Sequence, residues 1–258
     1  MVKLIYCLRR LPNLSREEFQ KYWRENHGPL VRSFRDTMHL RRYVQCHSFS
    51  FEWLDSSQRS TGRPEPFDGV AELWWDSLED FSPASPTEER TKVNAALYQD
   101  EIKFIDIQKS PVWLTGEHPI ITDIPEAGET AKPDSRVKFV YVLRCLSQLP
   151  SEQFHHYWLA HHGPLVRSFH PAMKVRRYVQ SHTAYDDINK YMQFERNRID
   201  YFDGVAELWW DSVETYVPEN QGSPHAKANR ALFEDETKFI DHSKSPMFLT
   251  KEYVFVNR

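Results

Sequence analysis

The sequence has few of the residues that build several common kinds of site. Only 8 of its 258 residues are glycine, and they form no Gly-rich phosphate-binding loop. Only 3 are cysteine, with no Cys-x-x-Cys pair, and neither a nucleophile-elbow serine nor a zinc motif is present. These absences argue against nucleotide-binding and hydrolase chemistry of the familiar kinds.

The chain also lacks a strong excess of charge of one sign. Its formal net charge is -4, without a basic field or a polybasic patch, so we expect neither nucleic acid nor a membrane surface as a partner. No apolar run is long enough to cross a bilayer, and the N-terminus enters a strand pattern without a signal peptide. Cys7, Cys46 and Cys145 lie in apolar, strand-like runs, which predicts buried free thiols in a reducing compartment and a cytoplasmic location.

What the chain does contain is an internal repeat. When the sequence is displaced by 135 residues, 2–123 align with 137–258 without a gap, and 57 of the 122 aligned residues are identical. HGPLVRSF at 27–34 recurs at 162–169, and FDGVAELWWDS at 67–77 recurs at 202–212. We therefore predict two domains of one kind, at 1–117 and 137–258.

The segment between the copies, 118–136, is rich in Pro, Gly, Thr and Asp and is predicted to be a linker. Two stretches differ strongly between the copies, 48–66 against 183–201 and 84–93 against 219–228. We interpret these as loops that set specificity on a common scaffold.

Each copy has the same predicted order of elements. In the first, a strand at 2–9 precedes a helix that Ser15 and Glu18 begin with a capping box, and Gly28 is expected to end that helix before Pro29 starts a new turn. Strands at 40–49 and 68–75, a helix at 87–104 and a strand at 111–117 follow. The second copy lacks the serine cap, so its first helix is expected to start about one residue later.

This β-α-β-β-α-β order is that of a ferredoxin-like α+β unit, with helices on one face of a four-stranded antiparallel sheet. Along 69–75, Ala71, Leu73 and Trp75 form an apolar face suited to helices, while Glu72 and Trp74 lie on a mixed face. We predict that the sheets of the two copies pack face to face through their mixed faces. The result is a pseudo-dimeric α+β barrel in which the mixed face lines a cavity.

The segments KLIYCLRRLPNLSREEFQKYWRENHGPLV (3–31) and FDGVAELWW (67–75) resemble the signature of EthD-type proteins, and both copies match over nearly their whole length. The resemblance implies the dimeric α+β barrel superfamily, with two domains fused where one is usual, and a small-molecule site. That superfamily includes cofactor-free oxygenases, isomerases, polyketide cyclases, dehydratases and haem-binding enzymes, so the fold does not select the reaction. EthD-type domains are associated with oxidative ether degradation, and fungal relatives with dehydration of polyketide intermediates.

His27 and His162 are the predicted catalytic residues. Each is expected to end the first helix of its copy, where the carbonyl end of the helix dipole favours a protonated ring that can act as acid or base. The alternative is a structural histidine that bonds the free carbonyl groups of the helix end.

Glu72 and Glu207 are predicted to act with them, because a carboxylate in mid-strand among apolar residues needs a partner or a raised pKa. Further residues are expected on the same cavity wall: His47 and His182 to orient or tune the acid and base, and Tyr43, Tyr178, Gln45, Gln180, Trp74 and Trp209 to bind substrate. The alternative for the two glutamates is a buried structural network with Arg41 or Arg176.

The second copy concentrates His155, His156, His161 and His162 in one helix. Zinc-binding helices use ligands at i and i+4, and these spacings do not match, so no metal is predicted and solvated surface histidines are expected.

The favoured hypothesis is an enzyme without a cofactor, a lyase or isomerase of dehydratase or cyclase type that acts on a hydrophobic aromatic or polyketide-like substrate. Two alternatives stay open: a haem-binding or oxygenase-type enzyme, and a non-catalytic module that binds a small molecule. A further homodimer is also left open.

Overall fold

The computed structural model describes residues 1–124, 135–195 and 199–258. The strands are β1 (Val2–Leu8), β2 (Arg42–Phe49), β3 (Gly69–Trp75), β4 (Val112–Thr122), β5 (Val137–Leu143), β6 (Arg177–Thr183), β7 (Gly204–Trp210) and β8 (Met247–Asn257). The α-helices are α1 (Arg16–Tyr22), α2 (Gly28–Ser33), α3 (Glu52–Thr61), α4 (Leu78–Phe81), α5 (Glu88–Glu101), α6 (Ser151–Tyr157), α7 (Gly163–Met173), α8 (Asp186–Glu195), α9 (Val213–Tyr216) and α10 (Pro224–Glu236). π-Helical turns at Trp23–His27 and Trp158–His162 and short 3₁₀ turns at Ile107–Lys109 and His242–Lys244 complete the elements.

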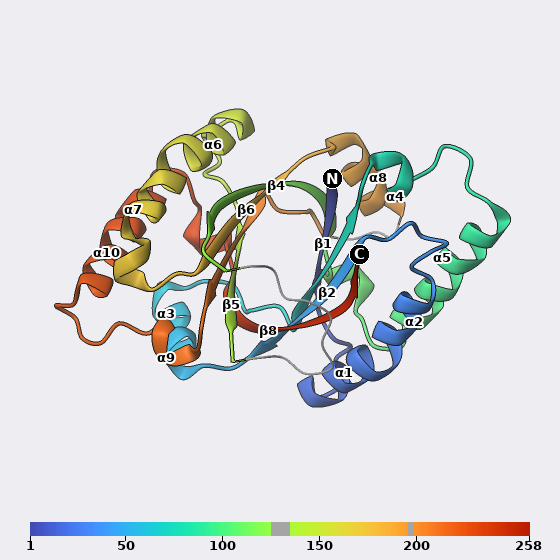
Figure 1. The fold of residues 1–258 in the computed structure, drawn as a ribbon, viewed down its shortest axis with the longest axis horizontal. Coiled ribbons are helices and arrows are strands. Elements are labelled where there is room, and N and C mark those ends of the chain that lie inside the picture. The colour runs from blue at the N-terminus through green and yellow to red at the C-terminus, as the bar shows by residue number, and fades with distance from the viewer. Residues whose placement is uncertain (125–134, 196–198) are drawn as a thin grey trace.

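The strands form one closed barrel in the order β1-β3-β2-β8-β5-β7-β6-β4, and every pairing is antiparallel. The helices lie in two groups on opposite sides of the barrel, one group over the sheet of each repeat (Figure 1). The two sheets join where β2 pairs with β8 and where β4 pairs with β6. The predicted pseudo-dimeric α+β barrel is therefore confirmed.

Strand β4 is longer than the sequence pattern predicts. Its first half pairs with β1 in its own repeat and its second half pairs with β6 in the other, up to the pair Thr122 and Arg177. Because β6 supplies backbone partners, 118–122 of the predicted linker are strand instead. Residues 125–134 of that linker lie outside the described residues.

The first helix begins as predicted, with a capping box between Ser15 and Glu18. It does not end at Gly28, which has right-handed helical angles (φ -57°, ψ -53°) and continues the chain from the π-helical turn into α2. Gly28 is needed for close approach instead, since a Cβ atom there would lie 2.3 Å from the ring of Phe255 and 2.9 Å from Gln45 Nε2. The second copy starts its helix at Ser151, which aligns with Arg16 at the start of α1, so the expected shift of about one residue does not occur even though Pro150 replaces the serine cap.

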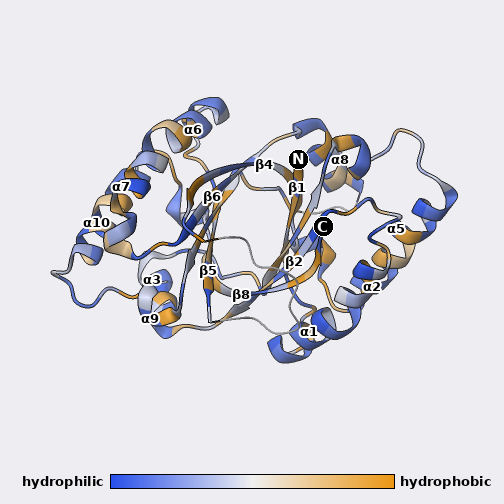
Figure 2. Cartoon of the chain, viewed as in Figure 1, coloured by the Kyte–Doolittle hydropathy of each residue, from blue (hydrophilic) through white to orange (hydrophobic). Residues whose placement is uncertain are grey.

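The two faces of the sheets carry different residues. Ala71 and Trp75 of β3 pack under the helices, while Val70 and Trp74 point into the barrel with Val44 and other apolar side chains, which confirms the predicted faces of β3. Apolar residues accordingly run along the strands and on parts of the helices, as Figure 2 shows. The interior of the barrel is thus filled by side chains.

The predicted face of β2 is wrong. Val44 pairs with Glu72 and Tyr43 with Leu73, and directly paired residues point to the same side, so Tyr43, Gln45 and His47 face the helices. Both faces of β2 carry polar as well as apolar residues, so the sequence pattern alone does not show which face points into the barrel. The register of β2 against β3 decides it.

Two helices cross from one repeat to the other. Helix α3 belongs to the first repeat but lies beside α9 with the helices of the second, and α8 of the second repeat lies near α4 with the helices of the first (Figure 1). Leu54 of α3 is part of the apolar core that contains Trp158, and Met192 of α8 packs on the core that contains Trp23. The two helices lie in the divergent segments 48–66 and 183–201.

Cys7 and Cys46 are buried free thiols as predicted, whereas Cys145 is half-buried. Burial raises the pKa of all three thiols, so none is activated as a thiolate. Within the described residues, no helix combines the length and the apolar character that a membrane span requires.

Candidate active site

In each repeat, a cavity lies between the outer face of the sheet and the helices that cover it. The first cavity has a volume of about 420 Å³, and His27, Tyr43 and Tyr191 of α8 are among its walls. The second has a volume of about 210 Å³ and includes His162 and Tyr178, with Trp53 of α3. The predicted cavity within the barrel is replaced by a space of about 20 Å³, about that of a water molecule.

His27 is the last residue of the π-helical turn, and its ring is bonded to α5. Nδ1 lies 2.9 Å from Asp100 Oδ2, and Asp100 also accepts hydrogen bonds from Tyr22 Oη at 2.7 Å and Lys103 Nζ at 3.1 Å. The hydrogen bond with His27 holds the pKa of Asp100 well below its usual range. An ionised carboxylate can only accept, so Nδ1 carries the hydrogen and Nε2 is the nitrogen left for a ligand.

The second repeat has the same pair. His162 Nδ1 lies 2.8 Å from Asp235 Oδ2, and Tyr157 and Lys238 donate to the same carboxylate. His162 packs against Phe239 as His27 packs against Phe104. The predicted histidines are therefore brought to the cavity walls, each with a fixed tautomer.

The sequence analysis missed the acidic residues of both cavities. Asp100 and Glu101 close α5, and Asp235 and Glu236 close α10. Glu101 lines the first cavity and Glu236 the second. Burial raises the pKa of Glu236. The Asp-Glu pair is identical in both copies, and that identity at the end of a helix whose first turns diverge was the signal that could have revealed it.

Gln45 and His47 support the π-helical turn rather than the cavity wall. Gln45 Nε2 donates to the carbonyl of Trp23 at 2.9 Å and to Tyr43 Oη at 2.9 Å, while His47 Nε2 bonds to Gln45 Oε1 and its ring stacks on Trp23. Burial lowers the pKa of His47 to about 3, with a further contribution from Arg24. Gln180 and His182 repeat these contacts around Trp158.

Tyr43 and Tyr178 do reach the cavities. Each accepts a hydrogen bond from the indole of the π-helical turn, Trp23 or Trp158, and each lines the cavity of its own repeat. Of the predicted substrate-binding residues, the two tyrosines alone lie on cavity walls.

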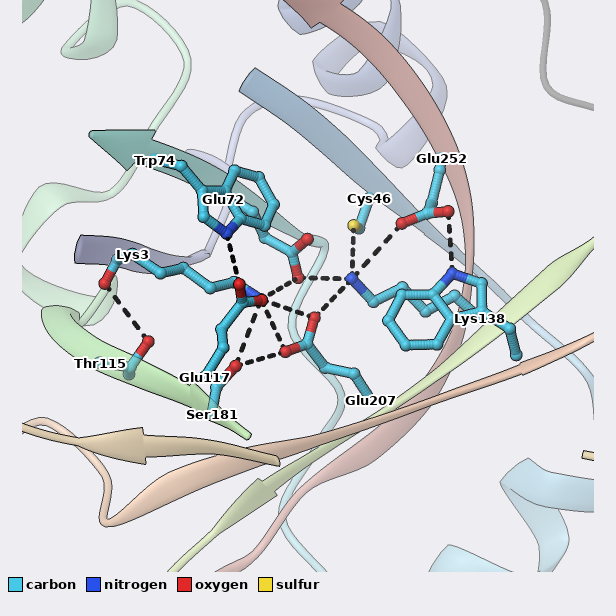
Figure 3. A network of polar contacts seen from close by, with 11 residues as sticks. Lys3, Cys46, Glu72, Trp74, Thr115, Glu117, Lys138, Ser181, Glu207 and Glu252 are labelled. Carbon is cyan, nitrogen blue, oxygen red and sulfur yellow. Dashed lines mark hydrogen bonds and ion pairs between the residues drawn. The ribbon is translucent and has the colours of Figure 1, made fainter. Parts of the chain in front are cut away.

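Glu72 and Glu207 lie inside the barrel, away from both cavities, in a network of polar contacts to which both repeats contribute (Figure 3). Lys3 Nζ lies 2.6 Å from Glu207 Oε2, and Lys138 Nζ lies 2.5 Å from Glu72 Oε1 and 2.7 Å from Glu207 Oε1. Burial and Glu207 raise the pKa of Glu72 to about 8. Burial opposes the ionisation of Glu207, but Lys138 and Lys3 outweigh it and hold its pKa well below the usual range.

This network corrects two expectations. No predicted histidine reaches Glu72 or Glu207, and the partners of these glutamates are lysines rather than arginines, since Arg41 pairs with Asp76 and Arg176 with Asp211 on the surface. Trp74 and Trp209 belong to the same interior, where they donate to Glu117 and Glu252. The arrangement connects the two repeats and leaves little room for a substrate.

The comparisons with known proteins agree with this architecture. The EthD domain pattern matches residues 11–108 and 147–243, which is most of the chain. The chain belongs to the EthD family. No curated protein matches it in sequence.

Solved structures resemble this EthD protein in fold at low identity. A Fusobacterium nucleatum protein described as a candidate monooxygenase is 6% identical, with a TM-score of 0.50, over 98% of this chain and 92% of its own. A dye-decolorizing peroxidase of Bacteroides thetaiotaomicron is 9% identical, with a TM-score of 0.47, over 97% and 93%. A mutant chlorite dismutase of Candidatus Nitrospira defluvii is 11% identical, with a TM-score of 0.46, over 97% and 90%. The similarity to the Fusobacterium nucleatum structure supports the barrel fold and nothing about the reaction.

Among the described residues of this EthD protein, one group of possible metal ligands converges: Cys46, Glu72 and Glu252. The amino group of Lys138 already lies among them, 2.5 Å from Glu72 Oε1, 3.5 Å from Glu252 Oε1 and 3.6 Å from Cys46 Sγ. A cation would meet this ammonium group, so the group does not fit a metal ion. The histidine-rich helix does not converge either, since His155 bonds the carbonyl of Asp203 and His162 bonds Asp235.

Proposed function

We propose that the protein is a cofactor-independent lyase or isomerase, a dehydratase or cyclase that acts on a hydrophobic aromatic or polyketide-like ketone by histidine acid–base catalysis. The observation that carries the proposal is the histidine–aspartate pair at the end of each π-helical turn, with the ring at the wall of a largely apolar cavity. π-Helical turns of this kind often occur at functional sites.

Dehydration of a β-hydroxy ketone requires a base for the proton α to the carbonyl and an acid for the departing hydroxyl group. In the second cavity, His162 supplies the base at Nε2, and Asp235 fixes the tautomer and stabilises the imidazolium that forms. Glu236, whose raised pKa favours the protonated form, is placed on the same wall to protonate the hydroxyl as it leaves as water. The C–H electrons become the new double bond, so neither an oxidant nor a reductant is consumed.

The walls of the cavities suit this chemistry. The second cavity is lined by Phe139, Leu208, Trp210 and Tyr216, which favour a flat apolar ring, and the first by Leu4, Leu73 and Trp75. Apolar walls exclude water from the reacting atoms and strengthen the interaction between an imidazolium and a developing enolate.

The proposal is tested with a panel of aromatic β-hydroxy ketones that includes 3-hydroxy-1-tetralone, whose dehydration gives water and fluorescent 1-naphthol. We expect turnover by the unmodified protein and a loss of about 10²- to 10⁴-fold in kcat/KM when His27 and His162 are both replaced by alanine. Each single variant then shows whether its own cavity is active. The exposed His156→Gln serves as the matched control and should leave turnover unchanged. Turnover retained in the folded double variant would contradict the acid–base role.

The alternative of a haem enzyme requires a histidine with a free Nε2 and a cavity that can also hold the two propionates. The histidine–aspartate pairs suit the first requirement. The first cavity has Glu101 and Glu195 and no Lys or Arg among its described lining residues, and the second, at about 210 Å³, is below the usual size of a cofactor pocket. The described walls therefore do not fit a haem, and an absorbance spectrum of the purified protein with added haemin tests this directly.

A further inference from the structure

Arg63 reaches the second cavity from the other repeat. It follows α3 in the first repeat and lies on the wall formed by the second, where Nη1 donates to Tyr141 Oη at 2.6 Å and to the carbonyl of Ser245 at 3.2 Å. Nη2 lies 2.7 Å from His242 Nδ1. Burial and the charge of Arg63 lower the pKa of His242 to about 4, so this imidazole is neutral and accepts the hydrogen bond.

All the partners of Arg63 within the described residues are neutral. None of its nitrogen atoms lies within ion-pair distance of a described carboxylate, and Nε is buried without a hydrogen-bond partner. The acidic residue of this cavity, Glu236, stands outside that distance, and its pKa is raised by burial. The charge of Arg63 partly opposes that rise, so Glu236 acts on Arg63 only from a distance. A guanidinium on an apolar wall without a directly paired carboxylate gains a close partner when a ligand supplies the anion.

Tyr141 adds a second donor beside the guanidinium. Its oxygen accepts the hydrogen bond from Arg63, and its own hydroxyl hydrogen goes to no described acceptor. Burial raises the pKa of Tyr141, so the hydroxyl stays protonated and can donate. Arg63 and Tyr141 therefore place a cation and a neutral donor together on one wall of the cavity.

The repeat supports a shared role for this arginine. Segments 48–66 and 183–201 have 19 aligned residues each, and only two pairs are identical: Gln58 with Gln193 and Arg63 with Arg198. Arg198 lies outside the described residues. An arginine kept in both copies of an otherwise altered segment is consistent with recognition of a common feature of the ligand.

We infer that Arg63, held against Tyr141, selects ligands that carry an anionic oxygen on an aromatic skeleton, such as an aryl carboxylate or a phenolate, in the second cavity. The inference rests on the proposed function in naming the same cavity, and it adds the substrate class. A guanidinium suits this task because its planar fork matches a carboxylate in two hydrogen bonds. It also makes the second cavity depend on the first repeat, because Arg63 comes from the opposite half of the chain.

The test is calorimetric binding of 2-naphthoate and of its neutral analogue 2-naphthylmethanol to the full chain, which needs no turnover. We expect the unmodified protein to bind naphthoate more tightly than the alcohol. Arg63→Gln should weaken naphthoate binding by about tenfold or more, while it changes the binding of the alcohol by less than about twofold. Arg63→Lys should retain part of the naphthoate preference because it keeps the charge. Arg59→Gln is the matched control, since Arg59 lies on the surface of α3, just before Arg63, and pairs with Glu52.

Three results would overturn the inference. One is equal binding of the two ligands by the unmodified protein, or no binding of naphthoate at all. Another is an equal loss of affinity for both ligands in Arg63→Gln, without any recovery in Arg63→Lys, which would indicate that Arg63 only holds α3 in place. The last is a loss of naphthoate affinity in Arg59→Gln as large as that in Arg63→Gln. Binding also separates this inference from the proposed function, because histidine variants that keep turnover would refute the acid–base role and leave the anion preference standing.

Discussion

Lys3 Nζ lies 2.6 Å from Glu207 Oε2, although the two residues are 204 positions apart and belong to different repeats. Lys138 and Glu72 make the reciprocal contact at 2.5 Å. Each lysine thus makes its shortest ion pair with a carboxylate from the other half of the chain, in the interior of the barrel. The buried charges stabilise the pairing of the two repeats only while all of them are present.

Replacing Lys3 by Met is therefore expected to lower the free energy of unfolding by about 3–5 kcal/mol, because it leaves Glu207 buried without one of its two lysines. The double variant Lys3→Met/Glu207→Met should recover much of the lost stability, because it removes the carboxylate that Lys3→Met leaves without one of its partners. Urea denaturation measures both. Lys92→Met is the control, since Lys92 and Glu88 form an exposed pair, and it should change stability by less than about 0.5 kcal/mol. Equal effects of Lys3→Met and Lys92→Met would show that the network contributes nothing.

Asp100 and Asp235 are expected to be positioning residues for their histidines. Asp100→Asn and Asp235→Asn together should lower kcat on the β-hydroxy ketone panel by about 10²-fold or more and shift the pH–rate profile, because the amide no longer fixes the tautomer or stabilises the imidazolium. Steady-state kinetics against pH measures this. Lys103→Met removes a different partner of Asp100 and should have a much smaller effect. An unchanged pH profile in the Asn variants would argue for a purely structural pair.

His47 and His182 predict a difference in acid stability. Their folded-state pKa values, about 3 and about 2, lie below the unfolded value of about 6.5, so the stability that they contribute is present above pH 6.5 and is lost as the pH falls. As the pH falls from 6.5 to 5, each of the two histidines should lower the free energy of unfolding by about 2 kcal/mol. His47→Gln/His182→Gln should therefore lose less stability than the unmodified chain between pH 7.5 and 5.0.

Urea denaturation at the two pH values provides that comparison, with the exposed His156→Gln as control. Glu72, whose raised pKa gives the opposite pH dependence, is present in both proteins and cancels in the difference. An identical pH dependence of the double variant and the unmodified chain would be inconsistent with buried neutral imidazoles.

The glycines of the two HGP segments should tolerate alanine differently. A Cβ atom at position 28 would lie 2.3 Å from Phe255, whereas at position 163 the nearest atom, Gln180 Nε2, would be 3.0 Å away. Gly28→Ala should thus lower the melting temperature more than Gly163→Ala, while Gly116→Ala, with no atom within 4 Å, should be nearly neutral. Differential scanning calorimetry gives the order, and the reverse order would contradict the close packing at Gly28.

The repeat carried most of what could be predicted about the fold. Alignment at a step of 135 residues placed the strands and the paired sheets, because both are specified by local patterns that occur twice. The capping box at Ser15 followed from its own local pattern, which only the first copy has. The repeat also singled out His27 and His162, because both precede an identical Gly-Pro, and the structure places both at cavity walls. The functions of these residues stay predictions.

The sequence by itself determined two ferredoxin-like units, their pairing and the placement of His27 and His162 in the helical segment before an identical Gly-Pro, because periodicity and capping act over a few residues. The tertiary structure alone decided which face of β2 is inside, that lysines neutralise Glu72 and Glu207, and that Asp100, Asp235 and Arg63 reach the cavities. These contacts join residues from 66 to 204 positions apart, and their geometry depends on strand register and on two helices that cross between the repeats. Local patterns leave that geometry undetermined, because a shift of one residue in register moves every side chain to the other face.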